Sequence, residues 1–572
     1  MVRGSLVRVP LGTREVDGVV ESVGSDPDVD GGELKPVLEV TGRLPEPLLD
    51  LAVWIAEGTA STLARAVALV VPPPPPKRRL KPVAETVSED RPVTLTEAQQ
   101  AAVDAIERAR TDGAHEVLVH GVTGSGKTEV YLRAIERELA DGRGAIVLVP
   151  EIALTPQTAA RFQARFGDTV AVLHSALTPA RRGAEHRRIA AGEARVVVGA
   201  RSAVFAAMPR LGMIVVDEEH DASYKHESDP RYDARRVAAK RARLEAALVV
   251  FGSATPRPES WHGIPRRIAL PGRVGGPLPA VEVVDLRHDG GYPLTRPLRD
   301  ALGRIDDAGG RAILLQNRRG SAAAIHCRSC GHGWRCPRCD VSLSLHGGAR
   351  LVCHHCGHTE RPPRACPVCG SVDITRIGSG TRAVEEELGE LFPGLTVLRL
   401  DAETGMAMPD FRAEERTFAL LTQLAGRPGR PGDPQGRVLI QAWEPASRVV
   451  ELAARHAVEE FLDGELERRS ELGYPPYRRL VRVLVTASEP QVAEDIAATL
   501  ADAAAPALGD DQLLGPAPLF RLRDRSRSHL LVKTADPRPA AAVFRGLLRD
   551  LSADLRRAGA TAVVDVDPQS FN

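Results

Sequence analysis

Residues 116–135 read EVLVHGVTGSGKTEVYLRAI, in which an apolar run, a glycine-rich loop and a helical pattern follow one another directly. The loop at residues 121–128 matches G-x-x-x-x-G-K-[ST] in full. Gly121, Gly124 and Gly126 allow backbone N–H groups to close on phosphate oxygens, and the next helix adds the positive end of its dipole. The stretch therefore predicts a buried strand, a phosphate-binding loop and a helix. A glycine-rich turn that matches by chance is the alternative.

Two further segments complete a predicted nucleotide site. Lys127 would reach the β- and γ-phosphates, and Thr128 would ligate magnesium. The block MIVVDEEH ends a buried strand at Asp217, which could hold the same ion, and Glu218 could orient or activate the attacking water. Gln99, in LTEAQQAAV, could read adenine. Alone, DEEH could be a solvated acidic turn and Gln99 a plain surface residue. Beside an intact phosphate loop, they predict a site for ATP with Mg²⁺.

Strand and helix patterns alternate from Val93 to Leu248. Buried β-branched runs separated by helices are typical of a parallel α/β sheet. A second series has four apolar runs, at residues 311–317, 374–379, 395–401 and 437–443. A complete second lobe would need roughly five or six strands. We therefore expect a second α/β lobe that is incomplete.

All eight cysteines lie between positions 327 and 369, in four Cys-x-x-Cys pairs: Cys327/Cys330, Cys336/Cys339, Cys353/Cys356 and Cys366/Cys369. Each pair offers two thiolates at a spacing that suits tetrahedral zinc, so eight thiolates predict two four-cysteine sites. Spacing alone leaves nested and sequential pairing open. With eight thiolates available, the histidines nearby are expected to be surface groups and not ligands. This placement of cysteine favours zinc in a reducing cytoplasm over secreted disulfides.

Composition bounds the remaining possibilities. The 572 residues predict three or four domains. Seventy-five basic and 75 acidic residues cancel, so nucleic-acid binding must come from local patches. No apolar stretch is long enough for a signal peptide or a membrane span, so a cytoplasmic location and no membrane partner are expected.

Three segments are candidate DNA contacts. They are KRRLK at residues 77–81, the segment after DEEH, and RLRDRSRSHLLVK at residues 521–533. In the second segment, the aromatic and basic residues that suit base stacking and phosphate contact are Tyr224, Lys225, Tyr232 and Arg235. Each segment alone would usually be a solvated face. Together they predict DNA binding.

The motifs also occur in a recognisable order: GVTGSGKTEVY, DEEHDASYK, GSATP, the four Cys-x-x-Cys pairs, PDFRAEERT and QLAGRPGR. In this order they resemble the bacterial primosomal protein N-prime (PriA) family of replication-restart helicases, from near the N-terminus to DVDPQSF. The resemblance implies a superfamily-two helicase, an ATP-dependent enzyme with two RecA-like lobes and a zinc-ribbon insertion in the second. The expected fold class is therefore α/β multidomain, with a small β-rich N-terminal domain and an α+β C-terminal domain.

The expected domains follow from this resemblance together with the sequence patterns. They are a truncated N-terminal domain that binds DNA 3′ ends (1–71), a Pro-rich basic linker (72–92), the first RecA-like ATP-binding lobe (93–270), the incomplete second lobe (271–326 and 370–446), a two-zinc module (327–369) and a C-terminal DNA-binding domain (447–572). The family also implies particular partners. These are branched and single-stranded DNA at replication forks, primosome proteins, and the replicative helicase or its loader.

The resemblance also implies roles for individual residues. One zinc ion would be held by Cys327, Cys330, Cys366 and Cys369, and the other by Cys336, Cys339, Cys353 and Cys356. In QLAGRPGR, Arg427 and Arg430 would face the γ-phosphate as arginine fingers, although Pro428 replaces an expected small residue. A solvated basic turn is the alternative for these arginines.

The chain departs from the family pattern in three places. The first strand of the N-terminal domain is expected to be absent. Only about twenty residues separate the proline run from LTEAQQ, which leaves no room for a winged-helix domain. The sequence VLRLD passes straight into ETGMAMPDFRAEERT, so a GTQ-type block that contacts DNA and senses nucleotide is missing. Hydrolysis in the first lobe could then be uncoupled from stepping along DNA.

Three functions remain to be compared. The favoured one is a restart protein that binds abandoned forks and promotes primosome assembly and helicase reloading, with reduced or no unwinding. An active ATP-dependent 3′–5′ DNA helicase in the same pathway is the alternative, which the intact GKT and DEEH blocks favour. A zinc-ribbon nucleic-acid-binding protein outside replication restart would not explain the helicase blocks.

Overall fold

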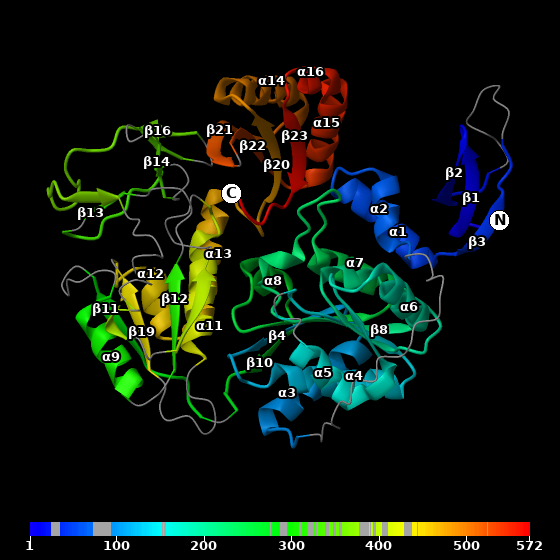
Figure 1. Ribbon diagram of the computed structural model, residues 1–572, viewed down its shortest axis with the longest axis horizontal. Helices are drawn as coiled ribbons and strands as arrows, with labels where there is room; N and C mark the ends of the chain where they lie inside the picture. The colour runs from blue at the N-terminus through cyan, green and yellow to red at the C-terminus, as the bar shows by residue number, and fades with distance from the viewer. Residues whose placement is uncertain are drawn as a thin grey trace. The chain divides into compact units, whose positions relative to one another are not determined.

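The computed structural model describes residues 1–24, 35–72, 93–151, 153, 156–274, 276–286, 294–307, 311–317, 325–327, 329–337, 342–346, 350–353, 357–376, 388, 390–392, 396–402, 410–427, 437–442, 444–522 and 524–571. The chain forms two compact units (Figure 1). The first comprises Met1–Pro256 with Ile264–Gly272, and the second comprises Arg257–Gly263 with Arg273–Asn572. The predicted linker lies outside the described residues from position 73 to 92.

A seven-stranded parallel sheet of order β10-β4-β9-β8-β5-β7-β6 forms the centre of the first unit (Figure 1). Its strands are β4 (Glu116–Gly121), β5 (Gly144–Leu148), β6 (Val170–Leu173), β7 (Val196–Gly199), β8 (Leu211–Val216), β9 (Leu248–Ser253) and β10 (Arg267–Leu270). Strands β5, β7, β8 and β9 are buried along their whole length, as expected for a parallel sheet covered on both faces. This confirms the predicted α/β lobe.

Helices and short 3₁₀ turns connect these strands. They are α3 (Glu97–Thr111), α4 (Lys127–Ala140), α5 (Pro156–Phe166), η1 (Gly167–Thr169), α6 (Pro179–Ala190), η2 (Arg201–Phe205), η3 (Ala222–Tyr224) and α7 (Ala234–Glu245). Helices α3, α4 and α5 contribute apolar side chains to one core beneath the sheet, including Ile106, Ile135 and Phe162. That core fixes α4, and hence the loop before it, against the sheet.

A small antiparallel sheet and two helices precede this lobe within the first unit. The sheet has the order β2-β1-β3. The elements are β1 (Ser5–Leu11), β2 (Arg14–Val19), β3 (Glu39–Arg43), α1 (Glu46–Gly58) and α2 (Leu63–Val70). The guanidinium of Arg236 in α7 lies 6.0 Å from the ring centroid of Trp54, and Arg65 forms an ion pair with Asp229. The predicted small β-rich domain therefore packs on α7 of the sheet domain.

The second lobe contains two separate parallel strand pairs within the described residues. β11 (Val281–Asp285) pairs with β19 (Val438–Ala442), and β12 (Arg311–Asn317) pairs with β18 (Thr396–Ala402). Its helices are α9 (Arg296–Asp307), α11 (Ala413–Ala425) and α12 (Arg448–Ala454). The described part of the chain thus has four lobe strands, the number expected, but not the same four.

The strand predicted at residues 374–379 belongs to the cysteine-rich segment instead. β17 (Ile374–Arg376) pairs antiparallel with β13 (Ile325–Cys327), so the two ends of the insertion form one ribbon. A second small sheet has the order β14-β15-β16. Its strands are β14 (Ser344–His346), β15 (Arg350–Val352) and β16 (Thr359–Glu360). The earlier assignment was wrong because a short apolar run does not identify its partner strand.

The C-terminal part of the second unit is an antiparallel four-stranded sheet with the order β21-β22-β20-β23 (Figure 1). Its elements are α13 (Val458–Leu472), β20 (Arg479–Ala487), α14 (Pro490–Leu508), β21 (Gln512–Leu522), β22 (Arg525–Thr534), α15 (Pro537–Asp550), α16 (Ser552–Arg557) and β23 (Thr561–Val566). The short helix α8 (Pro258–Gly263) belongs to the same unit and packs on α13. Helices α14 and α15 pack on this sheet, which confirms the predicted α+β domain. No helix in the described parts of the chain is long and apolar enough to cross a membrane.

Buried ion pairs hold α8, α11 and α13 together, and we call them the α11 ion cluster. Glu414 accepts hydrogen bonds from Arg335 Nη1 at 2.9 Å, Arg448 Nη2 at 3.0 Å and Arg468 Nη1 at 2.5 Å. The remaining members are Arg257, Glu259, Arg412, Glu415, Glu465 and Arg469. Because Arg335 lies between the cysteine pairs, Glu414 also ties the cysteine-rich segment to α11.

Candidate nucleotide and zinc sites

The phosphate loop has the conformation that its sequence predicts. β4 ends at Gly121, and α4 begins at Lys127. Gly124 and Gly126 have φ values of 82° and 83°, in the left-handed region that glycine adopts without strain. Lys127 is 8% exposed, and its Nζ donates to the Gly121 carbonyl at 2.8 Å. Thr128 lies half-buried in the first turn of α4. The loop therefore closes around its own lysine.

Gln99 supports this loop. It is 5% exposed and takes part in a capping box with Thr96 at the start of α3. Its Oε1 accepts from Thr96 N at 2.9 Å, and its Nε2 donates to Ser125 O at 2.9 Å. Both ends of the amide are thus engaged by the protein. Adenine recognition by Gln99 stays a prediction.

The acidic pair follows β8 at the carboxyl edge of the sheet. Burial raises the pKa of Asp217 to about 6, and the neighbouring Glu218 adds to this effect, while Lys127 opposes it. Glu218 has a φ of 46° and a buried Oε2 that makes no hydrogen bond within the described residues. Two partly buried carboxylates side by side are stabilised by a divalent cation, so these groups suit magnesium.

Sequence reasoning missed a tyrosine in this site. The hydroxyl of Tyr131, in α4, donates to Asp217 Oδ1 at 3.2 Å. Burial, followed by the charge of Asp217, holds the pKa of Tyr131 well above its ordinary value. The hydroxyl therefore keeps its proton and serves as a donor at neutral pH. The position of this tyrosine, one helical turn after the loop lysine, was the available signal.

The DEEH and GSAT blocks meet at neighbouring strand ends. His220 Nδ1 lies 2.8 Å from Ser253 Oγ, and the backbone N–H of Thr255 donates to the same oxygen at 3.0 Å. The backbone N–H of Glu219 donates to Gly252 O at 3.0 Å. Direct hydrogen bonds therefore join the DEEH block to the GSAT block.

The aromatic residues after DEEH do not present their rings to solvent. Tyr224 is fully buried, and its hydroxyl donates to the carbonyls of Leu148 at 2.9 Å and Asp217 at 2.5 Å. Tyr232 is 3% exposed, and Arg235 is bonded to the carboxylate of Asp233 at 2.7 Å. Lys225 is likewise buried, and its Nζ donates to a backbone carbonyl. The prediction that these residues offer a stacking surface is wrong for this conformation, because all four side chains are buried and the polar groups of Tyr224, Lys225 and Arg235 bind the protein's own backbone and carboxylates.

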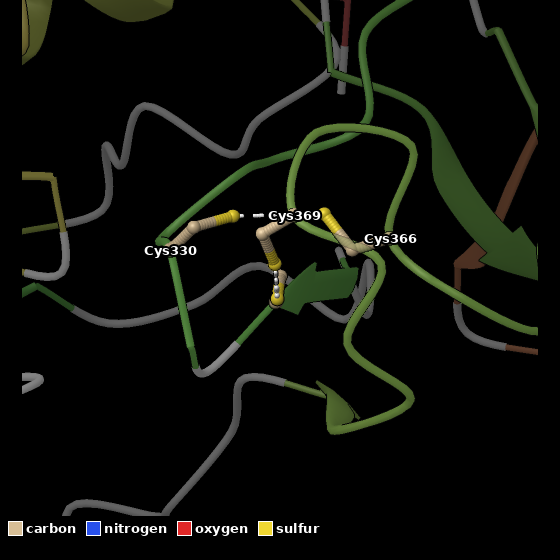
Figure 2. A group of neighbouring side chains, drawn as sticks. Cys330, Cys366 and Cys369 are labelled. Carbon is tan, nitrogen blue, oxygen red and sulfur yellow. Dashed lines mark hydrogen bonds between the residues drawn. The ribbon is translucent and has the colours of Figure 1, made fainter.

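One four-cysteine cluster is complete within the described residues (Figure 2). The Sγ atoms of Cys327, Cys330, Cys366 and Cys369 all lie within 4.8 Å of one another. The pairs Cys327–Cys369 and Cys330–Cys366 have Sγ–Sγ distances of 3.6 and 3.5 Å. Tetrahedral zinc with Zn–S bonds of about 2.3 Å separates its ligand sulfurs by about 3.8 Å. The arrangement fits zinc and joins the first cysteine pair to the last, as nested pairing requires.

The second predicted group is described only in part. Cys336 and Cys353 are buried in one small core with Trp334, Leu343 and Leu351. Cys339 and Cys356 lie outside the described residues, as do Pro428 and Arg430. Arg427 is exposed just after α11. The arginine-finger assignment therefore stays a prediction.

Comparison with known proteins gives four family matches along the chain. They are the 3'DNA-binding domain (3'BD) at residues 1–72, the DEAD/DEAH box helicase at 96–262, the PriA DNA helicase Cys-rich region (CRR) domain at 336–361, and the Primosomal protein N C-terminal domain at 470–569. The Replication restart protein PriA of Treponema pallidum is 38% identical and covers 99% of this chain and 95% of its own length. This chain belongs to the PriA replication restart family.

Two further similarities accompany that match. The Replication restart protein PriA of Bacillus subtilis is 39% identical, over 83% of this chain and 67% of its own length. The solved structure titled "Structure of RecG bound to three-way DNA junction" has a TM-score of 0.39 at 18% identity, over 67% of this chain and 50% of its own length. Membership of the PriA family supports a role in replication restart and DNA binding. The helicase domain implies use of nucleotide and magnesium, and the cysteine-rich region indicates zinc.

The alignment with the Treponema pallidum PriA protein spans 634 positions, more than the 572 residues of this chain. That relative therefore has segments without a counterpart here.

Proposed function

We propose that this protein binds abandoned replication forks and promotes primosome assembly and reloading of the replicative helicase, with reduced or no helicase activity. The length of one connection in the second lobe supports the proposed reduction or loss of helicase activity. β18 ends at Ala402 and α11 begins at Ala413, so only residues 403–412 connect them. A crossover between parallel strands takes a dozen or more residues. This connection is too short to contain another strand and its return.

A second lobe with two separate strand pairs in place of one sheet would have a mechanical consequence. A two-lobe motor converts hydrolysis into movement when both lobes close on nucleotide while both hold DNA. In the described residues, the pairs β11–β19 and β12–β18 form no common sheet. A closing force applied to one pair is then poorly transmitted to the other. Nucleotide binding by the first lobe does not depend on that transmission.

The proposed nucleotide is ATP with Mg²⁺. Lys127 would neutralise phosphate charge, and Thr128 and Asp217 would hold the metal, which supplies charge stabilisation at the phosphates. Glu218 would orient water, and Gln99 would fix the loop and the base. The support is their convergence at one edge of the sheet, with Lys127 Nζ inside the loop. Arg427 and Arg430 remain candidates for the γ-phosphate.

The proposed zinc content is two ions per chain, in the nested order. The sulfur cluster at Cys327, Cys330, Cys366 and Cys369 supports the first site. The match of the Cys-rich region to residues 336–361, which contain the other four cysteines, supports the second. Closed four-thiolate sites leave no open position for catalysis, so both ions would be structural.

The domain assignments are proposed with the boundaries expected from the sequence. Residues 1–71 would bind DNA 3′ ends, and residues 447–572 would contribute to the grip on branched DNA. Matches to the 3'DNA-binding and C-terminal domains of the family support both assignments. Primosome proteins and the replicative helicase or its loader are the proposed protein partners. The alternative is an active ATP-dependent 3′–5′ helicase in the same pathway, which the intact phosphate loop favours.

The deciding experiment compares the wild type with Lys127→Ala on a labelled forked duplex. Fork binding is followed by fluorescence anisotropy, and strand displacement is followed with and without ATP. We expect both proteins to bind the fork and neither to displace a strand. ATP-dependent displacement that is lost in Lys127→Ala would establish the motor alternative. Failure of the wild type to prefer a fork over duplex would overturn the proposal as a whole.

A further inference from the structure

Tyr131 is the only tyrosine of α4, and it is buried with 1% of its surface exposed. Its ring belongs to the core beneath the sheet, together with Val119 and Val215. Its hydroxyl leaves that core and donates to Asp217 Oδ1 at 3.2 Å. A buried tyrosine hydroxyl needs a hydrogen-bond partner, and the partner here is the carboxylate of Asp217.

The neighbouring strand leaves space for this hydroxyl. Gly252 lies near the end of β9, and a Cβ atom built there would be 1.6 Å from Tyr131 Oη and 2.7 Å from its Cζ. Any larger residue would displace the hydroxyl. The hydroxyl is therefore enclosed between the end of β8, which precedes Asp217, and Gly252 of the GSAT block.

The helix gives this contact a fixed relation to the phosphate loop. Lys127 and Tyr131 are four residues apart in α4, so their side chains project from the same face. Lys127 reaches into the loop, and Tyr131 reaches Asp217. One rigid helix thus connects the group proposed to bind phosphate with the carboxylate proposed to hold magnesium.

We infer that Tyr131 is a positioning residue, whose hydroxyl orients the Asp217 carboxylate toward the magnesium ion of a bound nucleotide. This inference rests on the proposed nucleotide site. The hydrogen bond holds one carboxylate oxygen and restricts rotation of the side chain. Without it, the carboxylate of Asp217 would sample other orientations, and metal-dependent binding would weaken.

A matched control is available because Tyr224 is also buried beside Asp217. The hydroxyl of Tyr224 binds the backbone carbonyl of Asp217, whereas that of Tyr131 binds its carboxylate. Tyr131→Phe and Tyr224→Phe therefore remove equivalent groups from the same region. A general loss of packing or polarity would affect both variants alike.

The test measures the affinity of the full chain for fluorescent ADP, in EDTA and over a series of Mg²⁺ concentrations. We expect Tyr131→Phe to raise the half-saturating Mg²⁺ concentration about ten-fold, the effect of one charge-assisted hydrogen bond. Its affinity in EDTA should stay within about two-fold of the wild type. Tyr224→Phe should leave the Mg²⁺ dependence unchanged. Circular dichroism and thermal unfolding monitor folding.

Two outcomes would overturn the role of Tyr131: an unchanged Mg²⁺ dependence, or the same loss of affinity with and without Mg²⁺. If Tyr131→Phe misfolds, Gly252→Ala provides a second test of the role of Tyr131. Its added methyl group would occupy the position of the Tyr131 hydroxyl and displace it from Asp217. A wild type that binds no nucleotide at any Mg²⁺ concentration would instead overturn the proposed site itself.

Discussion

Glu414 contributes to the stability of the second unit, and Glu414→Gln should lower the free energy of unfolding of α11 and α13. The carboxylate accepts hydrogen bonds from Arg335, Arg448 and Arg468, and its side chain is 14% exposed. Glutamine keeps the shape and removes the charge. Three guanidinium groups would then share a neutral partner in a largely buried place.

The expected magnitude follows from the pKa. Burial alone would raise the pKa of Glu414, but Arg468 and Arg335 outweigh it and lower the pKa to about 2. An unfolded glutamate has a pKa of about 4.3, and each unit of difference corresponds to about 1.4 kcal/mol. The ionised group therefore contributes about 3 kcal/mol to the free energy of unfolding. This contribution is present above pH 4.3 and is lost as the pH falls from there toward 2.

Hydrogen exchange of the full chain, read by mass spectrometry, reports the stability of α11 and α13 separately from the other domains. At pH 7.5, Glu414→Gln should speed exchange of the slowest α13 amides about 100-fold, which corresponds to the 3 kcal/mol above. The ratio between variant and wild type should stay constant down to pH 5.5. The control is Glu451→Gln, an exposed member of an α12 ion pair, which should change little.

Two results would refute this reasoning. A change below about three-fold would mean that solvent or the other acidic residues replace Glu414. A ratio that shrinks between pH 7.5 and 5.5 would mean that Glu414 titrates near its ordinary range, so that the arginines do not hold it ionised.

Three further predictions concern the same unit. Cys366→Ser should lower the zinc content from two ions per chain to one, as measured by native mass spectrometry; an unchanged content would contradict the nested site. Phe418→Ala should cost about 3–5 kcal/mol, because Phe418 stacks on Phe461 with centroids 3.9 Å apart; protection of α13 from hydrogen exchange tests this. Asp410→Asn should speed C-terminal proteolysis, because Asp410 Oδ2 accepts from Phe571 N at 3.2 Å; wild-type resistance would disprove it.

Local chemistry explains which parts of the fold could be predicted. The phosphate loop is specified by residues next to one another, since glycine, lysine and the flanking strand and helix patterns lie within residues 116–135. Strand pairing is not local. The run at 281–285 was not predicted as a lobe strand, yet β11 pairs with β19 more than 150 residues later. A five-residue run such as VEVVD carries no information about such a distant partner.

In the candidate site, too, residues within a local motif could be predicted, and contacts between distant parts of the chain could not. Lys127 and Asp217 could be placed by motif, whereas the pairing of the first zinc cluster came from the family resemblance, because spacing left two pairings open. Tyr131 could not be placed, because its partner Asp217 lies 86 residues away and only the tertiary fold brings them together. Tyr224 was wrongly predicted to face DNA, because the local sequence does not show whether a side chain is buried. An aromatic residue beside basic ones has the same composition whether it faces DNA or is buried against backbone carbonyls.

The cysteine-rich segment also affects the entropic cost of closing the loop between β12 and β18. For β12 to pair with β18, the chain must close a loop of residues 318–395. A metal ion that joins Cys327 to Cys366 and Cys369 would exclude the segment between them from this loop, and the loop that remains to be closed would be roughly half as long. Each halving of a loop lowers its closure cost by about 0.6 kcal/mol. We therefore expect zinc to ease formation of the second lobe around an insertion that would otherwise separate its strands.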